Sequence, residues 1–186
     1  MAARTRLVFI LALSIGVSAC STISKKDCVR GDWQTIGFKD GKQGYTTDRL
    51  ESHAKTCAKV DVTPDAIAYQ KGHQAGVLEY CTPQNGSRVG RNNDEYRGVC
   101  PEELEYGFLE NYVTALRIKL DDLEIERDQV KDQLDEARDE RARLGADQPV
   151  PKQLRREIDY YQSRLSNLNS ERMRINDKIA KWSQKL

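Results

Sequence analysis

Residues 109–144 read LENYVTALRIKLDDLEIERDQVKDQLDEARDERARL, and the spacing of their apolar side chains predicts the structure of this half of the chain. Apolar residues recur in alternating steps of four and three, with two arginines in the series and almost wholly polar residues between. The repeated positions are Leu109, Val113, Leu116, Leu120, Leu123, Arg127, Val130, Leu134, Ala137, Arg141 and Leu144. This spacing is typical of a coiled-coil seam and predicts a long helix over residues 106–145.

A second seam follows in residues 154–186. Its positions are Leu154, Ile158, Tyr161, Leu165, Leu168, Arg172, Ile175, Ile179, Trp182 and Leu186. Two prolines in the short segment 146–151 must interrupt the helix between the two seams. We therefore predict a second helix over residues 152–186.

Two arrangements can bury these seams. In an antiparallel hairpin that turns near Pro149, Leu144 lies beside Ile158. Two attractive charge pairs then flank the seam, Glu140 with Arg164 and Glu126 with Lys178. In a parallel homodimer, Arg127 would stack on its symmetry mate, which costs free energy. We favour the hairpin because a short proline-bearing loop makes neighbouring helices antiparallel.

The amino end of the chain resembles an export signal of bacterial lipoproteins. Residues 1–19 place two arginines ahead of an apolar run that is too short to span a bilayer, and Cys20 follows a small residue. The resemblance implies cleavage before Cys20, acylation of its thiol and a tether over residues 20–26. Because Ser21 rather than Asp follows Cys20, similarity to enterobacterial sorting rules implies the outer membrane, facing the periplasm.

Composition separates the chain into two parts but names no partner. The 186 residues are 32% charged, yet the formal net charge is only +1, and neither half is basic enough to indicate nucleic-acid binding. Glycines concentrate between residues 31 and 107, whereas the last 86 residues hold many charges and few glycines. We expect a small helical domain over residues 27–105, followed by the helical hairpin.

Helix-start signals divide this small domain. Asp32 can cap a helix that begins near Trp33, and Asp48 with Glu51 resembles a capping box. The run Thr63-Pro64-Asp65 opens another helix, and Cys100-Pro101 is followed by two glutamates that begin a further one. Between them, Asn85-Gly86 and the polar residues to 94 predict a turn, with a short irregular hairpin that carries Val89 and Tyr96.

Four cysteines remain after Cys20, and an even number in an exported chain indicates disulfides. They are Cys28, Cys57, Cys81 and Cys100, which allow three connectivities. Antiparallel packing of successive helices would pair Cys28 with Cys57 and Cys81 with Cys100. The rival interpretation is a zinc site that uses His53 and His73, but no Cys-x-x-Cys pair is present, so we predict no metal.

Glycines fall on one side of two predicted helices, each time behind an aromatic residue. The first set is Trp33, Gly37, Gly41 and Gly44, and the second is Tyr69, Gly72 and Gly76. Glycine is unfavourable inside a helix, so such a face indicates close approach of two backbones. Charged neighbours exclude burial of these helices in lipid. The alternative is a glycine-lined groove for a glycan, with Trp33, Tyr69 and Tyr96 as stacking surfaces.

Together these residues resemble a known family. The motif comprises Asp27-Cys28, Asp32-Trp33, Ile36-Gly37, Asp40-Gly41, Gly44, His53, Cys57, Thr63-Pro64-Asp65, Tyr69, Gly72, Gly76, Tyr80-Cys81, Asn85-Gly86, Tyr96, Gly98-Val99-Cys100-Pro101 and Phe108. Over about residues 27–120 it resembles an uncharacterised family of proteobacterial lipoproteins, domain of unknown function 2799. The resemblance implies a small cysteine-bearing helical domain on an outer-membrane lipoprotein, and it implies no activity.

These observations predict a mainly α-helical protein, in which a small disulfide-stapled domain precedes a long antiparallel coiled-coil hairpin. We expect a structural or interaction lipoprotein with no cofactor, held at the membrane by its lipid, and with an envelope protein or a second copy as partner of the coiled coil. The alternative function is binding of peptidoglycan or another glycan. We predict no catalytic residues because neither histidine belongs to a recognisable nucleophile motif.

Overall fold

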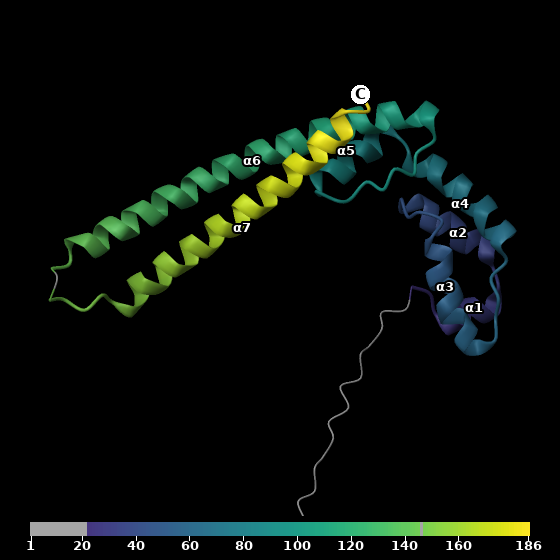
Figure 1. Cartoon of the computed structure of the whole chain (residues 1–186), viewed down its shortest axis with the longest axis horizontal. Coiled ribbons are helices and arrows are strands. Elements are labelled where there is room, and N and C mark those ends of the chain that lie inside the picture. The colour runs from purple at the N-terminus through teal and green to yellow at the C-terminus, as the bar shows by residue number, and fades with distance from the viewer. Residues whose placement is uncertain (1–21, 146) are drawn as a thin grey trace, which may run out of the picture.

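The computed structural model describes residues 22–145 and 147–186, and every regular element in this part of the chain is helical (Figure 1). The elements are α1 Lys25–Arg30, α2 Trp33–Lys42, α3 Arg49–Cys57, a 3-10 turn η1 Ala58–Val60, α4 Ala66–Tyr80, α5 Pro83–Arg91, α6 Glu102–Arg143 and α7 Lys152–Ser183. The predicted fold class is confirmed. No described helix is both long and apolar enough to cross a membrane.

Side-chain caps start four of the helices. Ser24, Asp32, Asp65 and Thr82 each accept hydrogen bonds from backbone N–H groups in the first turn of α1, α2, α4 and α5, respectively. The predicted cap at Asp32 is therefore confirmed. Asp48 stands at the N-cap of α3 but makes no side-chain capping bond, so the predicted capping box is not formed.

Helices α2 and α4 pack with their backbones in contact. A Cβ added to Gly37 would lie 2.0 Å from the carbonyl oxygen of Tyr69, and one added to Gly41 would lie 2.2 Å from that of His73. From the other side, a Cβ on Gly72 would lie 1.9 Å from the carbonyl oxygen of Gln34. The residue numbers of the contacting positions increase in the same direction along both helices, so α2 and α4 run parallel. The predicted close approach of two glycine faces is confirmed for Gly37, Gly41 and Gly72, whereas Gly44 lies beyond the end of α2 with a φ of 69° and is not part of the face.

Helices α5 and α6 repeat this arrangement. Gly86 and Gly90 of α5 lie against the carbonyl oxygens of Phe108 and Tyr112, where an added Cβ would come within 2.3 and 2.5 Å. The hairpin expected around Asn85-Gly86 is wrong, because Thr82 caps a helix and Pro83 occupies its first turn. Packing against α6 compensates for the low helix propensity of its glycines.

The two glycine-packed pairs share a plan along the chain. In each, a cysteine precedes a glycine-bearing helix, and a second cysteine precedes the longer helix that covers it. Tyr69 follows Cys57, and Tyr112 follows Cys100, by the same 12 positions. The small domain is therefore built from two similar units, and the second helix of the second unit continues as the hairpin.

Helices α6 and α7 form the predicted antiparallel hairpin, which extends away from the other helices (Figure 1). At 42 residues, α6 reaches about 60 Å. Buried side chains of both seams meet in the hairpin, among them Leu123, Val130, Leu168 and Ile175. Because these seams are covered within one chain, the arrangement differs from the parallel homodimer.

The register of the hairpin differs from the prediction. Glu126 pairs with Arg164 rather than with Lys178, and Lys178 instead donates to both oxygens of Asn93 at 2.7 and 2.8 Å. With Leu144 beside Ile158, Leu154 would have faced the loop. In the structure Leu154 is buried against α6. Burial of a leucine is worth about 1.5–3 kcal/mol, more than an exposed ion pair, and this difference selects the register.

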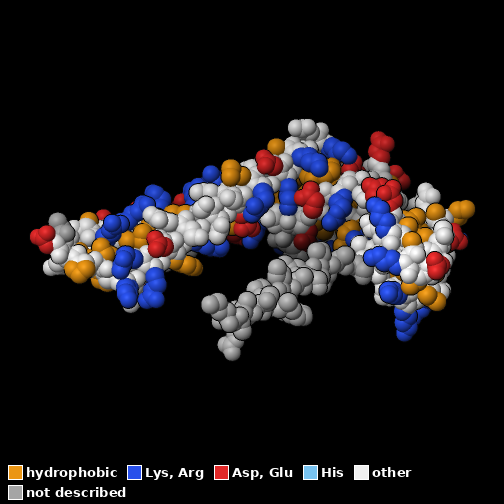
Figure 2. All heavy atoms as spheres, turned by 60° about the horizontal axis from the view of Figure 1, so that its bottom comes forward, with side chains coloured by type: hydrophobic (Ala, Val, Ile, Leu, Met, Phe, Trp, Pro, Cys, Tyr) orange, Lys and Arg blue, Asp and Glu red, His pale blue; other side chains and the backbone are white. Residues whose placement is uncertain are grey.

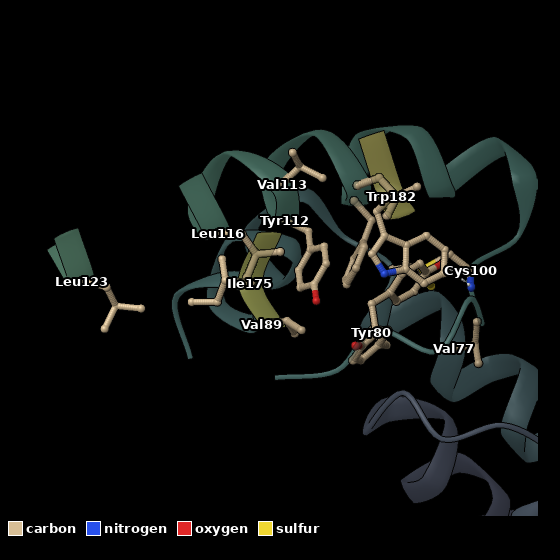
Figure 3. Close-up of a cluster of buried hydrophobic side chains, with 14 of the residues drawn as sticks. Val77, Tyr80, Val89, Cys100, Tyr112, Val113, Leu116, Leu123, Ile175 and Trp182 are labelled. Atoms are coloured by element: carbon tan, nitrogen blue, oxygen red, sulfur yellow. Dashed lines mark hydrogen bonds between the residues drawn. A yellow bond between two sulfur atoms is a disulfide. The ribbon is translucent and has the colours of Figure 1, made fainter. Parts of the chain in front are cut away.

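The carboxyl end of the hairpin completes the core of the second unit. Trp182, near the end of α7, is buried among the side chains of this core (Figure 3). Its ring centroid lies 4.6 Å from that of Tyr96. Tyr96 also packs on Phe108 and Tyr112 of α6. The predicted boundary between residues 105 and 106 therefore falls within one continuous helix and one continuous core.

Candidate functional site

The four cysteines pair as predicted, but not through the antiparallel packing of successive helices that the prediction assumed, because α2 packs on α4 and α5 on α6, each in parallel. Disulfides join Cys28 to Cys57 and Cys81 to Cys100, with Cα atoms 5.4 and 5.5 Å apart. Cys28 lies within α1, whereas Cys57, Cys81 and Cys100 lie at or next to helix ends. Cys20 and the predicted signal residues 1–19 lie outside the described residues.

The three aromatic residues considered for glycan stacking are inside the protein. Trp33 and Tyr69 belong to the core that surrounds the first disulfide, and Tyr96 belongs to the core at the base of the hairpin. Their exposed fractions are 4%, 1% and 0%. A sugar ring cannot reach these faces in this conformation, so a stacking role is corrected to core packing.

A buried carboxylate, which sequence reasoning did not single out, organises the first unit. Asp40 on α2 accepts hydrogen bonds from Tyr69 of α4 at 2.8 Å and from the His53 Nε2 of α3 at 2.7 Å. Its other oxygen lies 3.1 Å from the Arg49 Nε. We call these residues, together with Thr22, the Asp40 network.

The contacts keep Asp40 ionised. Burial alone would raise the pKa of its carboxyl, but the hydrogen bonds from His53 and Tyr69 and the charge of Arg49 outweigh burial and hold that pKa below its ordinary value. For Tyr69, burial and the neighbouring carboxylate both raise the pKa of the phenol. Tyr69 therefore stays protonated and donates to Asp40.

The network extends to the segment before α1. Because His53 Nε2 donates to Asp40, the Nδ1 of a neutral His53 is an acceptor, and the Thr22 hydroxyl lies 2.8 Å from it. Ile23 is buried in the core beside Cys28 and Trp33. The described part of the predicted tether is therefore packed onto the domain rather than extended from it.

In chemical terms the order hydroxyl, imidazole, carboxylate is the one that hydrolases use to activate a nucleophile. A hollow of about 370 Å³ lies beside Thr22 and is lined in part by Asp27, Arg30 and Lys39. The histidine of this series is 1% exposed, and its carboxylate also holds Arg49 and Tyr69. The hydrogen bonds of the Asp40 network hold α2, α3, α4 and the segment before α1 together, and we assign the network this structural role.

The histidines considered as metal ligands have other partners. His53 uses both ring nitrogens in the Asp40 network, and His73 Nε2 lies 2.7 Å from the carbonyl oxygen of Tyr45. The sulfur of Cys57 is bonded to Cys28 and is not a thiolate ligand. Among the residues that the structure describes, no group of three or more potential ligands is placed to hold a metal ion.

Tyr45 links the two units. The Arg49 Cζ of the Asp40 network lies 3.6 Å from the centroid of the Tyr45 ring. The Arg97 Cζ, from the segment before α6, lies 4.8 Å from the same centroid. Arg97 also donates to the carbonyl oxygen of Gly44. A chain of contacts therefore runs from Asp40 to the base of the hairpin.

A comparison with protein-family models finds a match that covers most of the small domain and the first part of α6. A family model described as protein of unknown function (DUF2799) matches residues 32–117, which begin at the cap of α2 and end within α6. This range contains both glycine-packed pairs, the Asp40 network except Thr22, and the second disulfide. No curated protein and no solved structure matches the chain. Residues 32–117 of this chain are therefore assigned to the family described as protein of unknown function (DUF2799).

Proposed function

We propose that this protein is a lipid-anchored structural protein of the cell envelope, held by Cys20 at the periplasmic face of the outer membrane. Its hairpin is the element that it offers to a partner protein. The proposal contains no catalytic step and no cofactor.

The observation that carries this proposal is the way the hairpin is joined to the domain. Helix α6 is continuous from the second disulfide to the hairpin turn, and Trp182 of α7 is buried in the core of the second unit. A hairpin held at its base by both helices cannot swing freely on a linker. It therefore extends as a rigid rod, which suits a spacer or a docking element.

Packing before α1 supports attachment close to the membrane. Two residues of extended chain span at most about 7 Å, so a lipid on Cys20 would lie near Thr22, which is bonded to His53. The exposed face of α1 carries Lys25 and Lys26, whose charges suit anionic lipid headgroups. The domain would then rest on the bilayer with little freedom to tilt.

The shaft of the hairpin carries apolar side chains where a partner protein could contact it. Ile118 and Ile125 lie seven residues apart on α6, on the side away from the seam, and are 55% and 59% exposed. Apolar residues at the centre of a contact are what protein interfaces use for affinity.

Two measurements test the proposal. Mass spectrometry of the purified mature chain should find acyl chains on Cys20, and none in a Cys20→Ala variant. A photo-crosslinking amino acid placed at Ile118 or Ile125 in cells should trap one recurring protein.

A matched control is the same crosslinker at Ile67, which is 83% exposed but lies on α4 in the small domain. The proposal fails if Cys20 carries no lipid. It also fails if the hairpin positions trap nothing, or only what Ile67 traps.

A further inference from the structure

The free end of the hairpin carries a cluster of positive charge that its shaft does not share. Residues 141–156 contain five Lys or Arg and one Asp. In the shaft, residues 117–140 contain five Lys or Arg and ten Asp or Glu, and residues 157–180 contain four of each kind. We call these cations the tip cluster: Arg141, Arg143, Lys152, Arg155 and Arg156. Figure 2 shows Lys and Arg side chains at this end of the molecule.

The tip cluster has no carboxylate partner, although Arg141 and Arg143 lie in the last turn of α6, where the helix dipole favours positive charge. All five side chains are exposed, and in the described part of the chain none lies within ion-pair distance of a carboxylate. Three of them follow the start of α7, whose first turn holds no acidic residue. Positive charge at the start of a helix is unfavourable, so these residues do not serve the stability of α7.

Apolar side chains at the same end are already used. Leu154 is buried in a cluster with Leu134 and Ala137, and Leu144 and Val150 pack against that cluster. Pro149 and Pro151 of the turn stay exposed, but none of the described residues 141–156 is a large apolar side chain with a mostly exposed surface. A protein interface needs apolar anchors at its centre, and insertion into a bilayer needs an apolar face, so neither is favoured here.

We propose that the tip cluster binds the carboxylate-bearing peptides of the cell-wall polymer, peptidoglycan. Guanidinium groups match carboxylates in planar, two-point hydrogen bonds, and four of the five cations are arginines. A polymer with repeated carboxylates can engage several of them at once without a large interface. The assignment rests on the proposed periplasmic location, and it uses a surface separate from Ile118 and Ile125.

The test is co-sedimentation of the full-length purified protein, in detergent, with isolated peptidoglycan sacculi. A tip variant would carry Arg141→Gln, Arg143→Gln, Lys152→Gln, Arg155→Gln and Arg156→Gln. A matched control would lose five exposed cations elsewhere through Lys55→Gln, Lys59→Gln, Lys71→Gln, Lys131→Gln and Arg174→Gln. Circular dichroism confirms that both variants keep their helices.

We expect the tip variant to bind sacculi about tenfold more weakly or worse, and the control variant to bind as the wild type does. Binding should also fall when the carboxylates of the sacculi are converted to amides, and when salt is raised from about 0.1 M to about 0.5 M.

Equal binding by wild type and tip variant, equal losses in both variants, or full binding to amidated sacculi would overturn the proposal. So would tip-dependent flotation with phosphatidylglycerol vesicles in place of sacculus binding, which would assign the cluster to a membrane. Because these assays need neither lipid on Cys20 nor a partner protein, their failure is distinct from failure of the proposed function.

Discussion

Replacement of Gly72 by alanine should destabilise the small domain, although alanine is the better helix former. The added Cβ would lie 1.9 Å from the carbonyl oxygen of Gln34, whereas ordinary contact begins at 3.4 Å. Helices α2 and α4 would have to separate by roughly 1.5 Å, and neither backbone can move aside by changing a rotamer. Overpacking costs about 1–3 kcal/mol, and a contact between two backbones belongs at the upper end, about 2–3 kcal/mol. Subtracting the roughly 1 kcal/mol that alanine contributes in a helix interior leaves a net loss.

Gly107→Ala is the matched control, since its Cβ would meet only the Pro83 Cγ at 3.5 Å. Urea and thermal unfolding of the oxidised protein, followed by circular dichroism, measure both variants. We expect a net loss of about 1–2 kcal/mol for Gly72→Ala, or a fall in Tm of several degrees, and no loss or a gain for Gly107→Ala. If Gly72→Ala is as stable as the wild type, the direct backbone contact of α2 and α4 is wrong.

Three further predictions concern other parts of the molecule. Asp40→Asn should cost about 3–5 kcal/mol at neutral pH, because it leaves charged Arg49 without its buried partner. The pKa of Asp40 is lowered on folding, so its contribution to wild-type stability is present above about pH 4 and disappears as the pH falls through the folded-state pKa. Urea titrations at a series of pH values should show that the variant lacks this part of the acid dependence. Trp182→Ala should cost about 3–5 kcal/mol in the same unfolding assay, since the ring is buried against Tyr96, and a neutral result would contradict the shared core. Arg164→Ala should cost less than about 1 kcal/mol, because both partners of its ion pair are partly exposed, and a loss as large as that of Trp182→Ala would show that charge rather than apolar burial sets the register.

The features that depend on residues close together in the chain could be predicted from the sequence. The seams from Leu109 and from Leu154 repeat with the four-and-three spacing that is typical of packed helices, and prolines 149 and 151 stop the helix between them. The glycine steps indicated backbone contact, and the placement of cysteines at helix ends favoured the two disulfides that the structure contains.

Helix α5 and the Asp40 network could not be predicted from the sequence, because both depend on contacts between distant residues. Helix α5 contains Gly86 and Gly90, which oppose a helix in isolation, and its stability comes from contact with α6. Asp40 belongs to the family motif as Asp40-Gly41, but nothing in the neighbouring residues marks it as a buried carboxylate. Its partners His53 and Tyr69 lie 13 and 29 residues away in sequence, and no local pattern joins them.

The two helical seams, the break between them, and a small domain with four cysteines and a glycine face follow from local sequence patterns. Periodicity, caps and helix breakers act over a few residues, so they are recognisable without knowledge of the fold. The hairpin register, the packing of Trp182 into the small domain and the Asp40 network arise instead from tertiary contacts. Those outcomes depend on the total apolar area buried and on the partners that a buried charge finds, and both are defined only when distant segments meet.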